Sequence, residues 1–438
     1  MISQSEKHET LLNRLQEFQR RTKGEFPSWV VDLQKQSFER AAKLGFPTLK
    51  DEEWKYTNIQ PIVERVYHFP PETKLREVTQ LKQYVHSDDI NIVLVNGSLA
   101  QDLSNLKKLP LGLKILTLQE AFKNNGIELQ NIFKKYDIHQ EGVFVALTKA
   151  LAHNGVYIEI TDKAIIEKVI HVVHVTSTTD TDIITTPYTM IKIGKSAEAT
   201  ILESYLGFNP EVIYFTNALT DILIHENTTL KYCKAQSECL KSYHIGATRV
   251  WQERDSNFLG FSLMVGGEIT RNNLDVVLNG KGASAILNGL YCVNGTQLVD
   301  NHTLVDHRQP NCTSNQLYKG ILNGSSRGVF NGKIFVQPIA QKTNSYQLNK
   351  NLLLGKESQV NTKPQLEIEA DDVKCTHGAT IGQLNEDEIF YLQSRAIAHK
   401  DAIRMLSHGF VDDILSTIQN QTICQKLNLL LEPTFAAL

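Results

Sequence analysis

The stretch TKPQLEIEADDVKCTHGATIG, residues 362–382, decides the fold. Apolar residues alternate with polar ones at Leu366, Ile368 and Ala370, which is the period of a half-buried β-strand. Asp371 and Asp372 then indicate a turn. The stretch therefore predicts two short strands joined by a tight connection.

The second predicted strand carries the candidate site. Val373, Cys375 and His377 recur at a spacing of two, so a strand places the thiol and the imidazole on one face. Sulfur and nitrogen side by side can ligate iron, zinc or a cluster. Two ligands fall short of the usual four, and a buried thiol beside a hydrogen-bonded core histidine is the alternative. Both interpretations stay open for Cys375 and His377.

Strand-like runs fill residues 141–383, where we expect nearly no helix. They are short, rich in Val, Ile, Thr and Tyr, and extend from Val143 to Leu147, Val156 to Ile160 and Lys168 to Val175 as far as Ile334 to Val336. Asn-Gly pairs that suit tight turns separate the later runs: Asn279-Gly280, Asn288-Gly289, Asn294-Gly295, Asn323-Gly324 and Asn331-Gly332. One β-sandwich of about 100 residues is too small for this length. Two sandwiches, a barrel or an irregular solenoid remain, and the unbroken succession of strands favours the solenoid.

Helices are predicted on both sides of this β region, in residues 1–140 and 384–438. Leu11, Leu12, Leu15 and Phe18 recur at helical spacing in the first region. In the second, Asn385 is a good N-cap, and an apolar face follows at Ile403, Leu406, Phe410 and Ile414. These last helices are expected to cap the end of the solenoid, to dock a partner, or to do both.

Composition narrows the class of protein. At 438 residues two or three domains are expected. The formal net charge of −3 argues against nucleic acid as a partner, and no apolar run approaches the roughly 20 residues that cross a bilayer. Six scattered cysteines without a Cys-x-x-Cys pair fit neither a disulfide framework nor a zinc site, so we expect a cytoplasmic protein. Gly194-Lys195-Ser196 lacks the upstream glycine of a phosphate-binding loop, because Thr189 stands there, and no nucleotide is expected to bind.

Residues 362–382, with NKNLLLG at 349–355 before them, resemble the signature of the SufD type within the SufB/SufD family. Members of this family are subunits of the SUF iron–sulfur cluster assembly complex. A second match lies at Gly45-Phe46-Pro47-Thr48 and Trp54-Lys55-Tyr56-Thr57, so the likeness covers most of the chain. The SufB type is usually longer and carries an N-terminal cysteine cluster that this sequence lacks. For Trp54-Lys55-Tyr56 itself, packing or a partner contact is favoured over RNA binding.

The resemblance implies a mainly β protein, a right-handed parallel β-helix flanked by N-terminal and C-terminal helical domains. It implies a non-enzymatic scaffold that pairs with a SufB-like subunit through the open β-helix end and docks a SufC-like ATPase on its C-terminal helices. Cys375 and His377 would then lie near iron, or near a transient iron–sulfur cluster shared with the SufB-like subunit. The chain would assist iron acquisition, and ATP would belong to the partner.

Two functions of other classes remain. An exposed last rung can pair with a second copy, so a homodimeric cluster carrier is one alternative. The other is an enzyme acting on a polysaccharide, which needs paired carboxylates on one solenoid face. Asp371 and Asp372 are adjacent in the sequence and so point apart in a strand.

Overall fold

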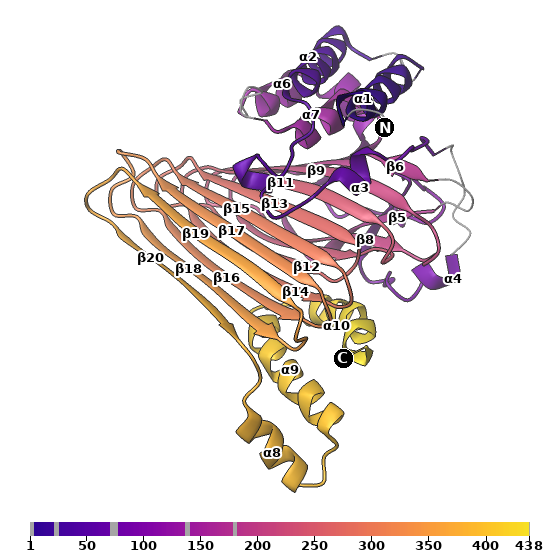
Figure 1. Cartoon of the computed structure of the whole chain (residues 1–438). Helices are drawn as coiled ribbons and strands as arrows, with labels where there is room; N and C mark the ends of the chain where they lie inside the picture. The colour runs from indigo at the N-terminus through magenta and orange to yellow at the C-terminus, as the bar shows by residue number, and fades with distance from the viewer. Residues whose placement is uncertain (1–3, 22–25, 71–77, 136–140, 178–181, 438) are drawn as a thin grey trace.

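Two long, facing β-sheets form the body of the protein (Figure 1). The computed structural model describes residues 4–21, 26–70, 78–135, 141–177 and 182–437. Over most of its length the chain alternates between the two sheets, and neighbouring strands of one sheet are parallel. This path is a parallel β-solenoid, and helical regions precede and follow it in the chain, so the predicted fold class is confirmed.

The first sheet has the strand order β2 (Ser98–Leu99), β1 (Ile90–Val95), β5 (Ile165–Thr176), β8 (Glu198–Gly207), β10 (Thr229–Ser237), β12 (Asn257–Met264), β14 (Ser284–Val293), β16 (Thr313–Leu322), β18 (Asn344–Leu353) and β20 (Lys374–Gly382). The second has the order β19 (Gln359–Ile368), β17 (Arg327–Val336), β15 (Leu298–His307), β13 (Ile269–Leu278), β11 (Tyr243–Gln252), β9 (Tyr214–Ile224), β7 (Tyr188–Ile193), β4 (Gly155–Ile160) and β3 (Leu113–Thr117), with β6 (Ile183–Thr185) beside β9.

The coils stack in register over the later part of the solenoid. In the first sheet a single column of Cα partners runs through Thr229, Asn257, Ser284, Thr313, Asn344 and Lys374. Side chains in such a column lie on the same face, because successive residues of a strand alternate between its two faces. The register therefore fixes which side chains share the interior between the sheets.

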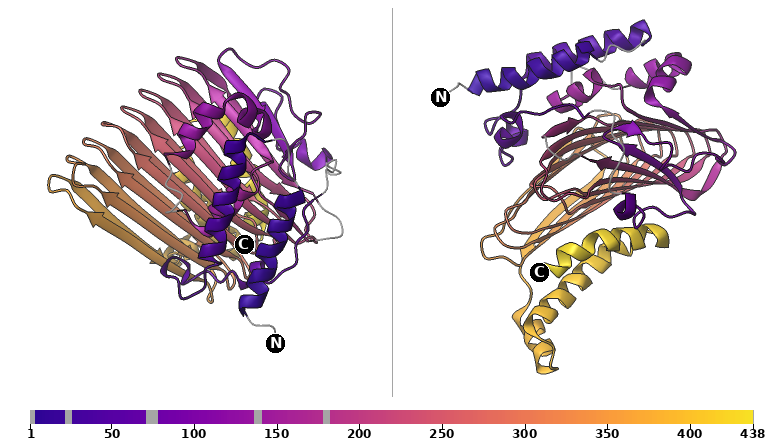
Figure 2. Two further views of the ribbon diagram at one scale, coloured as in Figure 1. Left: turned by 90° about the horizontal axis from the view of Figure 1, so that it is seen from above. Right: turned by 90° about the vertical axis from the view of Figure 1, so that its right-hand side faces the viewer.

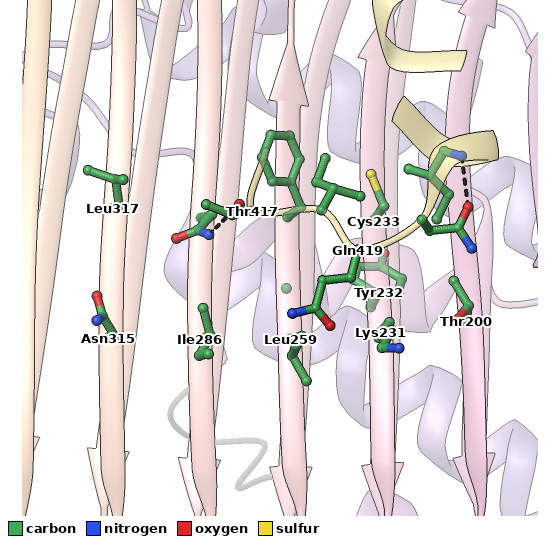
Figure 3. Close-up of a pocket in the computed structure, with 16 residues that line it drawn as sticks. Thr200, Lys231, Tyr232, Cys233, Leu259, Ile286, Asn315, Leu317, Thr417 and Gln419 are labelled. Atoms are coloured by element: carbon green, nitrogen blue, oxygen red, sulfur yellow. Dashed lines mark hydrogen bonds between the residues drawn. The ribbon is translucent and has the colours of Figure 1, made fainter. Parts of the chain in front are cut away.

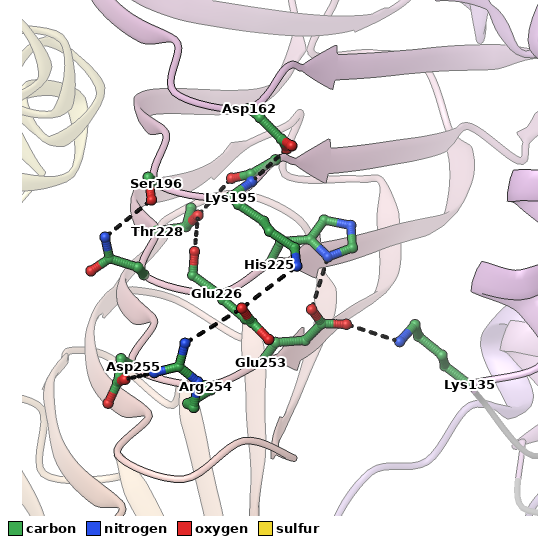
Figure 4. Close-up of polar contacts among 12 residues, drawn as sticks. Lys135, Asp162, Lys195, Ser196, His225, Glu226, Thr228, Glu253, Arg254 and Asp255 are labelled. Carbon is green, nitrogen blue, oxygen red and sulfur yellow. Dashed lines mark hydrogen bonds and ion pairs between the residues drawn. The ribbon is translucent and has the colours of Figure 1, made fainter.

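One row of turns repeats the same backbone conformation in coil after coil. Its residues of positive φ are Lys163, Ser196, Asn227, Asp255, Gly282, Asn311 and Lys342. Each of their N–H groups donates to a carbonyl of the next coil, as Ser196 does to Glu226 O at 3.0 Å. Side chains join neighbouring turns as well (Figure 4): the N–H of Lys195 donates to Asp162 Oδ1 at 2.8 Å, and Lys195 Nζ lies 3.6 Å from Glu226. The turn predicted at Asp371-Asp372 follows the same rule, since Asp372 O accepts from Lys342 N.

Two of the predicted Asn-Gly turns are wrong. Asn288-Gly289 lies within β14 and Asn331-Gly332 within β17. Glycine is needed there for its size, because a Cβ at Gly289 would lie 2.2 Å from the ring of Tyr318 on the next coil. By contrast, Gly295 and Gly324 have positive φ and lie in turns, as predicted.

A second correction concerns residues 143–147, which form helix rather than strand. They belong to α7 (Val143–Ala150), which is buried over most of its surface and packs against α2 and β9. The other elements of the N-terminal region are α1 (Gln4–Arg21), α2 (Ser28–Leu44), η1 (Glu52–Trp54), α3 (Gln60–Val63), α4 (Val78–Leu81), α5 (Leu118–Asn124) and α6 (Gly126–Phe133). α1 and α2 lie on one side of the solenoid and the C-terminal helices on the other (Figure 2).

The C-terminal helices cover the side of the solenoid and not its end, so the predicted end cap is wrong. α9 (His399–Leu415) contacts β14 and β16, and α10 (Gln421–Ala436) contacts β10 and β14. Their apolar residues share a core with the outward side chains of the first sheet. α8 (Glu386–Ser394) extends beyond the sheets (Figure 1). Within the described residues, no helix combines the length and the hydrophobicity needed to span a bilayer.

A buried polar contact fastens α10 to the start of the solenoid. Lys426 Nζ lies 2.6 Å from Asp89 Oδ2, and both side chains are at most 5% exposed. The ammonium also donates to His171 Nδ1 at 2.9 Å, while His171 Nε2 lies 2.9 Å from Ser204 Oγ. Burial and the neighbouring Lys426 charge lower the pKa of His171 well below its ordinary value, so the ring is neutral and accepts this bond.

Replacing Lys426 by Met is expected to destabilise the protein by roughly 3–5 kcal/mol, because it leaves the Asp89 carboxylate buried without its cation. Chemical unfolding monitored by circular dichroism measures this loss. The matched control is Lys241→Met, which removes the exposed Lys241–Glu211 pair and should cost less than about 1 kcal/mol. Equal losses of stability in the two variants would contradict the role of the buried Lys426–Asp89 pair in holding α10 on the solenoid.

Candidate functional site

The predicted site strand is β20, the last strand of the first sheet, and β19 is the last strand of the second. Among the described residues β20 pairs with β18 alone, and β19 pairs with β17 alone. The outer edges of both strands therefore present backbone N–H and C=O groups without a neighbouring strand. Such an edge is a template for pairing with another strand.

Cys375 and His377 lie on the inward side of this last rung. Their Cα partners on β18 are Ser345 and Gln347, which are 1% and 0% exposed. Cys375 is half-buried and packs against an interior cluster that contains Ile334. His377, the next residue after Cys375 on the same face of β20, is exposed. The strand thus brings thiol and imidazole to one face at the open end of the interior, the arrangement that the spacing of two predicts.

Burial raises the pKa of the Cys375 thiol, and a hydrogen bond with the backbone of Ser345 acts in the opposite direction. Within the described ranges, no group of three or more His, Cys, Asp or Glu side chains is placed to hold one metal ion. Cys375 and His377 alone offer two ligands, one soft and one borderline. Chemically, such a pair can contribute part of a coordination shell.

The N-terminal signature residues pack against the second sheet. The guanidinium of Arg271 lies 3.8 Å from the centre of the Trp54 ring, and its Nη1 donates to Glu53 O at 2.7 Å. Thr57 Oγ1 donates to Asp300 Oδ2 at 2.6 Å. The packing interpretation is therefore confirmed for Trp54, whereas Lys55 and Tyr56 are exposed.

Charged and polar side chains extend this contact across four consecutive strands of the second sheet, β13, β15, β17 and β19. His302 lies 2.9 Å from Asp300 and 3.2 Å from Glu53, Asn331 donates to Glu53 at 3.1 Å, and Lys363 of β19 pairs with Glu52. Burial opposes ionisation of Asp300, but the charges of His302 and Arg271 hold its pKa at about 2. Residues 52–57 are thereby tied to the same last coil that carries the site.

The four residues predicted to dock a partner differ in exposure. Ile414 is fully buried in the core between α9 and the first sheet. Phe410 is half-buried against the same core, and its carbonyl accepts from Lys319 Nζ at 2.9 Å. Leu406 and Ile403, one and two turns before Phe410, are half-buried. The predicted apolar face therefore packs on the solenoid at Ile414 and becomes partly exposed toward the N-terminal end of α9.

Sequence reasoning missed the most exposed apolar residues of this region. Phe390 and Tyr391 on α8 are 72% and 56% exposed, and Met405 on α9 is 51% exposed. The signal was present, because the run from Ile389 to Leu392 is apolar at four consecutive positions of one helix. A single helix face cannot bury such a run, and here only Ile389 is fully buried.

A cavity of about 400 Å³ lies between the first sheet and the connection from α9 to α10 (Figure 3). Its floor includes Cys233, Leu259 and Ile286, and Gln419 reaches across it. Thr417 Oγ1 accepts a hydrogen bond from Asn288 at 2.9 Å beside it. The packing of the helices on the sheet is therefore incomplete near this connection.

Comparison with known proteins agrees with this architecture. Residues 174–410 match the family described as SUF system FeS cluster assembly, SufBD core domain, and residues 5–172 match the SufBD protein N-terminal region. An iron–sulfur cluster assembly SufBD family protein of Synechocystis is 29% identical over 403 residues, 90% of this chain and 89% of the relative. The iron–sulfur cluster assembly protein SufD of Escherichia coli is 29% identical over 398 residues, 90% of each chain. A chloroplastic protein of Arabidopsis thaliana, ABCI7, is 29% identical over 410 residues, 91% of this chain and 85% of the relative. The chain therefore belongs to the SufBD family of the SUF system of iron–sulfur cluster assembly.

Proposed function

We propose that this chain is a scaffold subunit of iron–sulfur cluster assembly that performs no catalytic step of its own. It pairs through β19 and β20 with a SufB-like subunit, and its C-terminal helices dock a SufC-like ATPase. The observation that carries the proposal is the position of Cys375 and His377 on an end strand whose outer edge lacks a neighbour among the described residues. Because such an edge accepts a further strand, both side chains would lie at the seam between two subunits.

Iron is the substrate at this seam. Thiolate and neutral imidazole both suit iron, and together they supply two of the four ligands usual for a cluster iron. The partner's ligands complete the shell, so the nascent cluster is shared and leaves when it is transferred. Free thiols persist in a reducing compartment, and the six free cysteines support a cytoplasmic setting for this chemistry.

The C-terminal helices link the ATPase to the seam. Nucleotide binding changes the pair of scaffold subunits only if it favours one of their arrangements. The polar contacts of Lys426 and Lys319 hold α10 and α9 on the first sheet. The cavity beneath the connection between these helices leaves their packing on the sheet incomplete at that point. The exposed Phe390, Tyr391 and Met405 supply the apolar surface for docking.

Replacing His377 by Ala in the complex with both partners is expected to lower the iron content by about tenfold or more, as loss of a metal-site residue commonly does. Metal analysis of the purified complex and cluster transfer to an apo-ferredoxin measure the effect. Thr376→Ala is the matched control, because Thr376 is an exposed neighbour on the opposite face of β20. The complex should assemble in both variants, and normal iron content in His377→Ala would refute the assignment.

Replacing Phe390 and Tyr391 by Ser is expected to weaken docking of the ATPase by about 2 kcal/mol, or roughly thirtyfold in Kd, because exposed aromatic residues are common binding hot spots. Titration calorimetry measures the affinity, and thermal unfolding of the isolated chain should be unchanged. The control is Leu111→Ser, which removes a fully exposed leucine that does not belong to the C-terminal helices. Unaltered affinity in the double variant would exclude α8 from the interface.

A homodimeric cluster carrier is the second candidate function, and it is favoured by the outer edges of β19 and β20, which have no neighbouring strand among the described residues. Anaerobic reconstitution of the isolated chain with iron and sulfide distinguishes it from the scaffold. A stable coloured dimer on gel filtration supports the carrier, and a colourless protein supports a scaffold that needs its partner. The polysaccharide-active alternative has less support, because Asp371 and Asp372 lie in an exposed turn at the solenoid end.

A further inference from the structure

A second cavity, of about 510 Å³, lies between the N-terminal helical region and the second sheet. It is lined by the end of α2 and the residues that follow it, by η1, by the start of α7, and by β11 and β13. Three of its lining residues are aromatic and lie together: the ring centre of Phe144 is 5.8 Å from that of Phe46 and 5.4 Å from that of Trp54. A concave site with apolar walls and a few polar groups is typical of a small-molecule site.

One polar side chain in this lining is left without a partner. It is Asp275 of β13, whose carboxylate makes no hydrogen bond and no ion pair within the described residues. The other charged or amide side chains of the lining are occupied: Asp51 accepts from Thr48 N, Glu52 pairs with Lys363, Glu53 pairs with His302, Arg271 pairs with Asp300, and Asn273 donates to Gly246 O.

The stacking of the strands explains why Asp275 lacks a cation. Arg271 lies on the same face of β13, four residues earlier, but it is already paired. On the neighbouring strand β11 the Cα partner of Asp275 is Arg249. The guanidinium of Arg249 is paired with Asp221 and Glu141. Both nearby guanidinium groups are therefore committed to other carboxylates, and Asp275 is left to face the cavity.

The carboxyl group of Asp275 is ionised but poorly solvated. The residue is half-buried, and burial raises the pKa of its carboxyl to about 6, although the charges of Arg249, His302 and Arg271 act in the opposite direction. Most of this group is therefore charged at neutral pH. Because a desolvated charge without a partner is costly, the site favours a cation that can reach it.

The rest of the lining decides the class of cation. Four carboxylates and a single guanidinium line the cavity, so its field attracts positive ligands. Within the described ranges, no three His, Cys, Asp or Glu side chains are placed around one metal ion. An ammonium group on an apolar stem fits better, because the cation pairs with the carboxylate and the stem packs on the rings of Phe46 and Phe144.

We propose that this cavity binds a small organic amine, whose ammonium group donates to the Asp275 carboxylate and whose apolar part packs against Phe46 and Phe144. The bound amine joins α2 and α7 of the N-terminal region to β13 of the solenoid. The site is separate from Cys375 and His377, so the inference goes beyond the proposed function and does not rest on it.

The test titrates the isolated full-length chain with phenethylamine at neutral pH and measures the affinity by calorimetry. Phenethyl alcohol has the same shape without the charge, and phenylpropanoate carries the opposite charge. The amine is expected to bind at least about tenfold more tightly than the alcohol, because a hydrogen bond between two charged groups is stronger than a neutral one. The anion should not bind measurably.

Asp275→Asn keeps the size of the side chain and removes its charge, so it is expected to weaken binding of the amine by about tenfold or more. Since the carboxylate has no partner to lose among the described residues, this variant should unfold at a temperature no lower than the wild type. Asp412→Asn is the matched control, because it removes an exposed carboxylate from α9, and it should bind the amine like the wild type.

Three results would overturn the proposal: no binding of phenethylamine, equal affinity for the amine and the alcohol, or equal affinity of Asp275→Asn and the wild type for the amine. The comparison of amine with alcohol uses the unaltered chain and holds whether or not the variant folds. Normal iron content in the His377 variant would refute the proposed function and leave this site standing. Failure of the amine to bind would remove the site and leave that function untouched.

Discussion

A β-strand satisfies its backbone only when it has a neighbour on each side, and this constraint organises the whole protein. Each coil of the solenoid provides that neighbour for the coil before it, in both sheets at once. The repeated turns follow from the same need, because their N–H groups also bond to the next coil. The stack must nevertheless end, and it ends at β19 and β20, whose outer edges have no neighbouring strand in the part of the chain that the structure describes. The candidate site lies where the internal pairing runs out.

Charged and polar side chains hold the helical regions on the two outer faces of this stack. On one face Lys426 of α10 is paired with Asp89, and on the other Arg271, which is itself paired with Asp300, donates to the carbonyl of Glu53 in the N-terminal region. Both pairs are buried, so each cation is essential to the carboxylate it neutralises even where the pair adds little net stability. The helices are thus fixed at specific points, while apolar contacts fill the area between them. Such anchoring would suit the scaffold role that we propose.

Local patterns in the sequence were sufficient for much of the fold. The alternation in residues 362–382 identifies both end strands, and the spacing of Cys375 and His377 places them on one face, because the period of two is a local property. Residues 143–147 misled for the same reason: a helix buried almost all round has no amphipathic period and resembles a buried strand. The turn predicted at Asn288-Gly289 was wrong because glycine occurs both in left-handed turns and at positions of close packing. Only the facing ring of Tyr318 distinguishes the two uses.

The register between coils could not be predicted from the sequence, and the finer features of the site depend on this register. That Ser314, Ser345 and Cys375 share a column follows from three strands about thirty residues apart, with turns of unequal length between them. No pattern within one strand contains this information. Likewise, the burial of Ile414 and the exposure of Phe390 depend on how α8 and α9 meet the sheet. Helical spacing identifies an apolar face but does not say what covers it.

The contact of residues 52–57 with four successive strands has a consequence for how the solenoid unfolds. A repeat array that is held together only by nearest neighbours can fray from its free end, one coil at a time. Here the pairing of Glu52 with Lys363 joins residues 311 positions apart and fastens the last coil to the N-terminal segment. Detachment of the last coil then also requires that the Glu52–Lys363 pair break. The order of the edge at β19 and β20 is consequently coupled to that of the N-terminal segment.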